Sequence, residues 1–243
     1  MSRYWLPAAV LAGAALVGGI TACGGQSPTS SGSVATTAAP TTTAALTAND
    51  VTSAIQSASA VHVKGTMSDS GTNVALDVQL NKDGTASGTV GIGGPNYPIV
   101  LANKVVYIQF TPDVLKSVGL SATSGPGKTI VNKWVPSTSK LMANSDLASS
   151  VQPLLDYSQF TGSIVQSMPS GAMKPGKSDT VDGTPVQQYT MSDGTPADIA
   201  TSSPHYLIRL LPGPTDGAGQ LDFTNWNQPV AVTAPSASEI YTG

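Results

Sequence analysis

The chain has 243 residues, of which 40% are hydrophobic, 5% are aromatic and only 10% are charged, with a net charge of −3. This hydrophobic content is enough for a core, and the length beyond the N-terminal segments suits one domain. The basic residues form no dense cluster along the sequence, which argues against a nucleic-acid partner. Composition therefore indicates a single globular domain outside the nucleic-acid-binding classes.

The N-terminal segment has the layout of a bacterial lipoprotein signal. Arg3 lies in a short polar start, an apolar run follows, and Ile20-Thr21-Ala22-Cys23 places two small residues before the chain's only cysteine. We predict that residues 1–22 are a signal peptide and that Cys23 carries diacylglycerol and a further acyl chain such as palmitate. An uncleaved membrane anchor, for which the apolar run is short of the roughly 20 residues needed, and an ordinary signal peptide with a buried free cysteine remain alternatives.

Residues 23–46 are predicted to comprise the lipidated Cys23 and a flexible tether. The segment is dominated by Gly, Ser, Thr, Ala and Pro and has no charge, so it cannot bury enough apolar surface to offset its ordering entropy. Two or more acyl chains hold a protein stably on a bilayer. We therefore expect a lipid-anchored protein on the extracytoplasmic face of the cell membrane, in the periplasm or equivalent envelope space, with its folded domain at residues 47–243.

A short helix is predicted directly after Thr47, because four apolar residues there fall on one stripe at helical spacing. From Val61 the period changes to two, which is typical of half-buried antiparallel strands. The helical stripe consists of Val51, Ala54, Ile55 and Ala58. The strands predicted in this first part cover residues 61–67, 74–80, 85–92, 97–101 and 105–110.

The middle of the chain is predicted to be mainly helical and the last third to return to strands. Helices are expected at 112–118 and 145–168, with Pro153 bending or dividing the second one. Further strands are expected at 134–135, 177–181, 185–191, 206–211, 220–226 and 230–233. Strands on both sides of helical insertions predict an α+β fold, in which one large curved antiparallel sheet has its concave face covered by a few helices.

In this order of elements the chain resembles the mycobacterial and actinobacterial lipoproteins of the LprG/LppX type, which share the LolA-like half-barrel fold. The segments that carry the resemblance are the Cys23 motif, Val61-His62-Val63, Lys133-Trp134, residues 180–184 (TVDGT), and residues 221–235 (LDFTNWN followed by PVAVTAP). The sequence departs from that pattern in its insertion at 119–129. The resemblance implies an internal hydrophobic cavity that binds acylated lipids or glycolipids for transport or chaperoning across the envelope, and a possible envelope transporter as partner. It implies no catalytic motif.

The apolar face of the first strands supplies the candidate cavity lining. Strands rich in Val, Ala and Gly leave side-chain volume unfilled, and a dry apolar void can hold an acyl chain. The candidate lipid-binding residues are Val61, Val63, Met67, Val74, Leu76, Val78, Val90 and Ile92. The alternative is a non-enzymatic surface interaction lipoprotein that uses the same fold with a filled core.

Nothing in the sequence marks an enzyme, and no cofactor or metal is expected. His62 and His205 are the only histidines, and neither forms a metal-binding or nucleophile motif with its neighbours. A hydrolase would need a Ser or Asp within hydrogen-bond reach of one of them inside a cleft.

Overall fold

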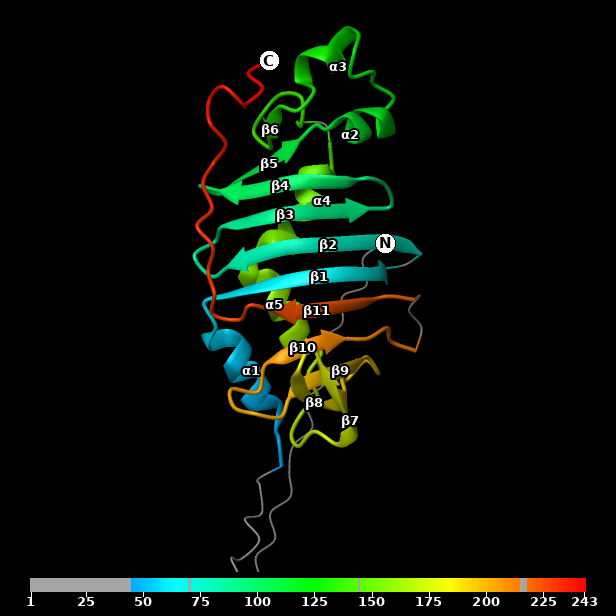
Figure 1. The fold of residues 1–243 in the computed structure, drawn as a ribbon, viewed down its shortest axis with the longest axis vertical. Helices are drawn as coiled ribbons and strands as arrows, with labels where there is room; N and C mark the ends of the chain where they lie inside the picture. The colour runs from blue at the N-terminus through cyan, green and yellow to red at the C-terminus, as the bar shows by residue number, and fades with distance from the viewer. Residues whose placement is uncertain (1–44, 70, 144, 215–217) are drawn as a thin grey trace, which may run out of the picture. The chain divides into compact units, whose positions relative to one another are not determined.

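The computed structural model describes residues 45–69, 71–143, 145–214 and 218–243, and these residues contain one eleven-stranded antiparallel sheet (Figure 1). The predicted signal peptide, Cys23 and nearly all of the predicted tether lie outside the described residues. The strands follow the order β6-β5-β4-β3-β2-β1-β11-β10-β9-β8-β7. The sheet is curved and does not close, so the predicted α+β fold with a large curved antiparallel sheet is confirmed.

The first six strands form a continuous meander, in which each strand pairs with the next one along the chain. Turns with positive φ, such as the one at Asn103-Lys104, connect the first five of these strands, and a longer segment with α2 and α3 leads from the fifth to the sixth. These strands are β1 (Ala60–Asp69), β2 (Thr72–Asn81), β3 (Ala86–Ile92), β4 (Asn96–Ala102), β5 (Val105–Gln109) and β6 (Trp134–Pro136).

The last five strands form a second meander that runs back to the first. They are β7 (Pro175–Val181), β8 (Thr184–Thr190), β9 (Pro196–Ala200), β10 (Leu207–Leu210) and β11 (Gln220–Thr224). The two meanders join where β1 pairs with β11, in a register that sets Val63 opposite Phe223 and Gly65 opposite Leu221. Gly65 has a φ of +144°, and a Cβ at this position would overlap the carbonyl oxygen of Gln220. Glycine therefore permits the close approach of the two strands at this seam.

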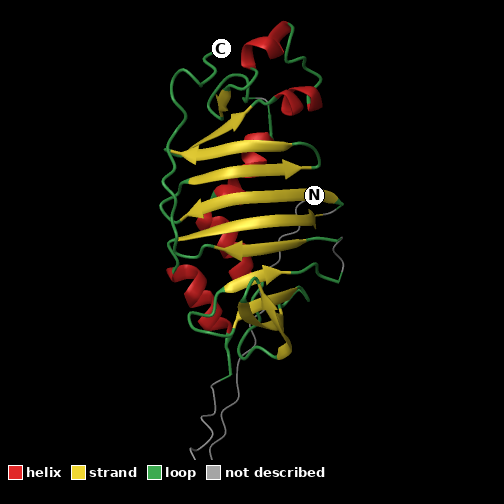
Figure 2. Ribbon diagram, in the orientation of Figure 1, coloured by secondary structure: helices red, strands yellow, loops and turns green. Residues whose placement is uncertain are grey.

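Five helices accompany the sheet among the described residues, and α4 and α5 run behind its strands (Figure 2). Their bounds are α1 (Ala48–Ser57), α2 (Pro112–Ser117), α3 (Gly125–Ile130), α4 (Leu147–Leu155) and α5 (Tyr157–Gln166). The predicted division of the long helical region occurs at Asp156, three residues after Pro153. The Tyr157 hydroxyl donates a 2.6 Å hydrogen bond to the carbonyl of Ile55, which fixes α5 to α1. None of the described helices has both the length and the apolar character needed to cross a bilayer.

The core lies between the inner face of the sheet and the helices α1, α4 and α5. The stripe predicted on α1 is buried, with Val51, Ile55 and Ala58 having no exposed surface. On the sheet side, Leu80, Ile99 and Ile108 are equally inaccessible. At about 25 cal/mol per Å² of apolar area removed from water, this layer is the main source of stability.

Three details of the fold differ from the sequence predictions. Strand β9 (Pro196–Ala200) and helix α3 (Gly125–Ile130) were not expected. The strand predicted at 230–233 was wrong, because that segment is extended but pairs with no strand. Val230 instead exchanges hydrogen bonds with the side-chain amide of Asn81, and the C-terminal tail crosses the ends of the strands (Figure 1).

Candidate functional site

A hollow of about 250 Å³ opens between α5 and the ends of three strands, β1, β10 and β11. We call it the α5 pocket. Its apolar surface comes mainly from Met67, Ile164, Met191, Leu210, Leu211, Pro212 and Leu221. Its polar surface comes from Thr66, Ser68, Ser163, Ser167, Asp193, Thr195 and Gln220, with Gly219 completing the lining.

Helix α5 forms one wall of the α5 pocket because its sequence fixes both its start and its buried face. Asp156 is the N-cap, and its Oδ1 accepts a 2.9 Å hydrogen bond from the backbone N–H of Gln159. Tyr157, Phe160 and Ile164 then fall on one side of the helix and are buried against the sheet. Ser163 and Ser167 follow at the pocket, where their small side chains leave space that a larger residue would fill.

The turn after β8 forms a second wall, next to the end of α5. Its Ser192 donates two hydrogen bonds to the C-terminal end of α5, from its backbone N–H to the carbonyl of Ser167 at 2.8 Å and from its hydroxyl to the carbonyl of Met168 at 3.0 Å. These contacts hold Met191 and Asp193 beside the helix. The wall is therefore built by hydrogen bonds to carbonyls that the end of the helix leaves free.

The structure places the eight predicted cavity-lining residues in two environments. Met67 lines the α5 pocket and is 39% exposed. The other seven belong to the core layer or pack against its edge. Of these, Val61, Val63, Leu76, Val78 and Val90 are buried, and Val74 and Ile92 are partly buried. A role for these residues in binding lipid stays a prediction.

Two other hollows are less suited to an apolar ligand. One of about 220 Å³ lies beside β10 and β11, where apolar residues such as Ile208 and Trp226 share the lining with two carboxylates, Asp182 and Asp222. The other, of about 620 Å³, lies over β2 and β3 and is lined mostly by glycine and small polar residues. Ligand pockets are mainly apolar with a few polar groups, a description that fits the α5 pocket better.

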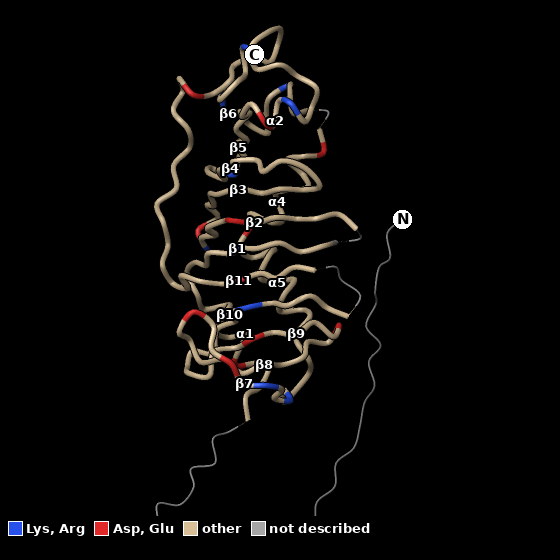
Figure 3. The backbone as a smooth tube through the Cα atoms, turned by 45° about the vertical axis from the view of Figure 1, so that its right-hand side comes forward, with Lys and Arg blue, Asp and Glu red and all other residues tan. Residues whose placement is uncertain are grey.

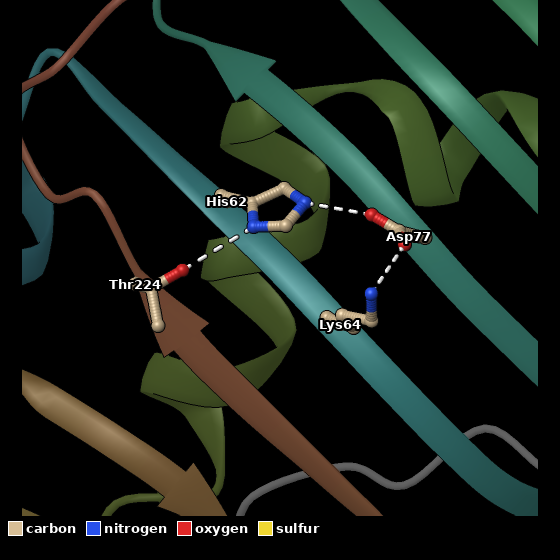
Figure 4. A network of polar contacts seen from close by, with 4 residues as sticks. All are labelled: His62, Lys64, Asp77 and Thr224. Carbon is tan, nitrogen blue, oxygen red and sulfur yellow. Dashed lines mark hydrogen bonds and ion pairs between the residues drawn. The ribbon is translucent and has the colours of Figure 1, made fainter. Parts of the chain in front are cut away.

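The outer face of the seam carries a polar network that links three strands (Figure 4). His62 on β1 contacts Asp77 of β2 through Nε2 at 2.8 Å and the Thr224 hydroxyl of β11 through Nδ1 at 3.2 Å. Lys64 contacts the second carboxylate oxygen of Asp77 at 2.9 Å. The hydrogen bond from Lys64, followed by that from His62, lowers the pKa of Asp77 below its ordinary value of 3.8.

This network bears on the hydrolase hypothesis, since His62 does have an aspartate within reach. The side chains project from paired strands, and the backbone N–H groups of β1 form ladders with both β2 and β11. Such strands offer no free N–H pair to stabilise an oxyanion. His205 directs Nδ1 to the carbonyl of Ala200 at 3.0 Å. The arrangement around His62 fits cross-strand pairing better than catalysis.

A second ion pair continues the polar outer face onto β10. Arg209 Nε donates to Asp222 Oδ1 at 2.7 Å, and the Gln220 amide donates to the other carboxylate oxygen at 2.9 Å. The bond to Asp222 raises the pKa of Arg209. Among the described residues, no group of three or more His, Cys, Asp or Glu side chains could hold a metal ion.

An open, curved antiparallel sheet with helices packed along one face and an apolar pocket between them defines the half-barrel class. Among solved structures, the chain is similar to LprF from Mycobacterium bovis, with 16% identity over 78% of this chain and 95% of that one and a TM-score of 0.50. It is also similar to the lipoprotein LppX from Mycobacterium tuberculosis, with 15% identity over 76% of this chain and 95% of that one and a TM-score of 0.43.

The likeness to LprF shows that the chain has this half-barrel fold, and the fold expected from the LprG/LppX-type resemblance is therefore confirmed. No protein-family model matches the sequence, and no curated protein sequence matches it.

Proposed function

We propose that this protein is a lipid-anchored lipoprotein of the cell envelope that binds one acyl chain of a lipid or glycolipid in the α5 pocket, as a carrier or chaperone. The observation that carries the proposal is the pocket itself, which has apolar side chains from the sheet and hydroxyl-bearing residues of α5 around it. Removing an acyl chain from water would drive binding, at about 25 cal/mol per Å² of apolar area.

The size of the pocket limits the ligand. Its volume of about 250 Å³ lies below the range of roughly 300–1,000 Å³ typical of ligand sites. We therefore expect one acyl segment to enter, with the polar headgroup outside. Ser163, Ser167 and Asp193 are the polar groups at the pocket nearest to α5 and its adjoining turn, and they are placed to contact an ester or hydroxyl group of such a headgroup.

The membrane relation is part of the same proposal. Cys23 would carry the acyl groups that hold the protein on the extracytoplasmic face, and a partner transporter would deliver or receive the lipid. A Cys23→Ser variant is expected to fold normally and to appear in the soluble fraction. Retention of that variant by membranes washed with high salt would place the anchor elsewhere.

The binding proposal is tested by native mass spectrometry of the Cys23→Ser protein purified from its own host. This variant carries no acyl anchor, so any acyl chain detected belongs to a bound lipid. We expect a bound acylated lipid that organic solvent releases. Ser167→Leu adds a large side chain to the pocket and should reduce lipid occupancy at least tenfold. Ser158→Leu adds the same volume to an exposed position of α5 outside the pocket lining and should leave occupancy unchanged.

One observation favours a second candidate, a surface interaction lipoprotein with a filled core. The inner face of the first meander is buried in the core, with Val61, Val63 and Val78 having no exposed surface. If the purified protein holds no lipid, or if Ser158→Leu and Ser167→Leu change occupancy equally, the carrier proposal fails and this second function is favoured.

A further inference from the structure

The charges of the domain are distributed unevenly along the sheet. Residues 103–143, which run from the β4–β5 turn through α2 and α3 to just beyond β6, contain five lysines and one acidic residue, Asp113. We call this part the basic end. Its lysines are Lys104, Lys116, Lys128, Lys133 and Lys140. The rest of the chain beyond residue 44 has five basic and thirteen acidic residues, one of which, Glu239, lies beside Lys133 at this end. The basic end therefore keeps an excess of positive charge, whereas the remainder of the domain is acidic.

Four of these lysines are free to act on a partner. Lys104, Lys116, Lys128 and Lys140 are exposed, and within the described part of the chain no ion pair or hydrogen bond engages their ammonium groups. By contrast, Lys133 donates to the carbonyl of Ser238 at 2.7 Å. Figure 3 shows the lysines of this region around α2 and β6, apart from most of the acidic residues.

The basic end also exposes aliphatic side chains. Val118, at the end of α2, is 53% exposed, and Leu141, after β6, is 44% exposed. Their sequence neighbours Leu115 and Met142 are buried, so both segments are held firmly on the core while the two side chains face solvent. Together with Met67 and Val230, they are the large hydrophobic residues most exposed among those described.

We propose that the basic end docks on an anionic phospholipid bilayer. Protein interfaces are depleted of Lys and enriched in Tyr, Trp, Phe and Arg. The basic end has no Arg, and its aromatic residues Tyr107, Phe110 and Trp134 are buried or half-buried. Each lysine close to a membrane surface adds electrostatic attraction to anionic headgroups. Exposed aliphatic side chains can enter the boundary between headgroups and acyl chains. The composition therefore fits a bilayer better than a protein partner.

The position of the basic end makes this a contact separate from any anchor at Cys23. The described chain begins beside the opposite edge of the sheet, where Thr47 pairs with Ala172 just before β7. Strands β6 and β7 are the two edges of the sheet, and ten strand spacings of about 4.8 Å separate them along its curved surface. Docking would add a second attachment point and orient the domain on the membrane.

The experiment measures co-sedimentation of the chain from residue 23 onward, carrying Cys23→Ser, with lipid vesicles. We expect binding to vesicles of equal parts phosphatidylglycerol and phosphatidylcholine, weakening as salt is raised, and no binding to phosphatidylcholine alone. Lys116→Gln/Lys128→Gln should weaken binding about fivefold per lysine, hence roughly 25-fold. Val118→Ser/Leu141→Ser should also weaken it. Thermal unfolding of each variant verifies that it is folded.

The matched control is Lys174→Gln/Lys177→Gln, which removes the same charge from exposed lysines at the β7 edge and should leave binding unchanged. Equal losses in the two double variants would overturn the proposal, as would equal binding to neutral and anionic vesicles. Salt-sensitive retention on immobilised polyglutamate without vesicle binding would also overturn it, in favour of an acidic protein partner. The Ser167→Leu protein should bind vesicles normally. The vesicle test of the basic end and the lipid-occupancy test of the α5 pocket can therefore fail independently of each other.

Discussion

The two meanders build their inner faces differently, although they share one sheet. In the first meander, long strands place Val, Leu and Ile at alternate positions, and these residues are sealed beneath α4 and α5. In the second, the strands are shorter, and Gly219 before β11 and the turn after β8 line the α5 pocket together with Ser163 of α5 and its C-cap Ser167. The same sheet thus has a buried inner face over most of its first meander and a pocket at the strand ends, where the facing residues Ser163 and Ser167 are small.

The largest expected effect comes from a cavity made in the filled half. Leu80 is fully buried, and Leu80→Ala should lower the free energy of unfolding by about 2–5 kcal/mol, because the surrounding side chains relax only partly. Leu210→Ala, at a partly buried pocket residue on β10 in the second meander, should lower the free energy of unfolding by less than that. Urea unfolding of both variants measures the difference, and equal losses would show that the halves are packed alike.

The seam between the halves is tested next. A Gly65→Ala methyl group would collide with the backbone of β11, so we expect a loss of about 2–3 kcal/mol as the strands separate. Gly183→Ala, in the β7–β8 turn, also has positive φ but has no atom within 4 Å of the added Cβ, and should cost about 1 kcal/mol. Urea unfolding in which Gly183→Ala is the more damaging of the two would contradict the close approach at Gly65.

A smaller loss of folding stability is expected from a change at the start of α5, the helix that forms one wall of the pocket. Asp156→Ala removes the acceptor for the Gln159 N–H and should cost about 1 kcal/mol. Asp146 occupies the same position at α4, but its side chain makes no capping bond, so Asp146→Ala should have a lesser effect. Hydrogen exchange of the α5 amides would show faster opening only in Asp156→Ala, and unchanged exchange in that variant would exclude the capping role.

The smallest effect concerns the outer face of the seam. Because the pKa of Asp77 is lowered in the folded state, its contribution to stability is present above the unfolded pKa of about 3.9 and is lost as pH falls through the folded value. We expect the Asp77 carboxyl to titrate below 3.8 by NMR and its pKa to rise in Lys64→Met. The accompanying change in stability should be under about 1 kcal/mol, since the pair is partly exposed. A pKa unaffected by Lys64→Met would remove Lys64 as the cause.

Most of the sheet could be predicted because its strands alternate apolar and polar residues. Strand β9 has the sequence PADIA, which is too short to show a period, and it forms because β8 and β10 flank it. Residues 230–233 have strand propensity but lie between Pro229 and Pro235, and the tail meets an Asn81 side chain instead of a free sheet edge. Local pattern does not reveal such tertiary neighbours.

The candidate site was less accessible from the sequence. Alternation assigned Met67 to the inner face, but the α5 pocket depends on serines of α5 that attract no notice in a chain rich in serine. The contact of His62 with Asp77 and Thr224 requires the register of three strands. The lysines of the basic end lie five to twelve residues apart in the sequence and form no dense run, so the fold is needed to gather them. These features depend on long-range pairing, which no local window contains.

The pairing of β1 with β11 has a consequence for how the protein reaches its native state. Apart from this pair, every strand neighbour in the sheet is also adjacent in chain order, so each meander can form through nearby contacts. Among the strand pairs, the seam joins the segments most distant in the chain, such as His62 and Thr224, which are 162 residues apart. Because such distant ends meet slowly, we expect the folding rate to be set by this single junction. Until β11 has been synthesised and has paired with it, β1 remains an open edge.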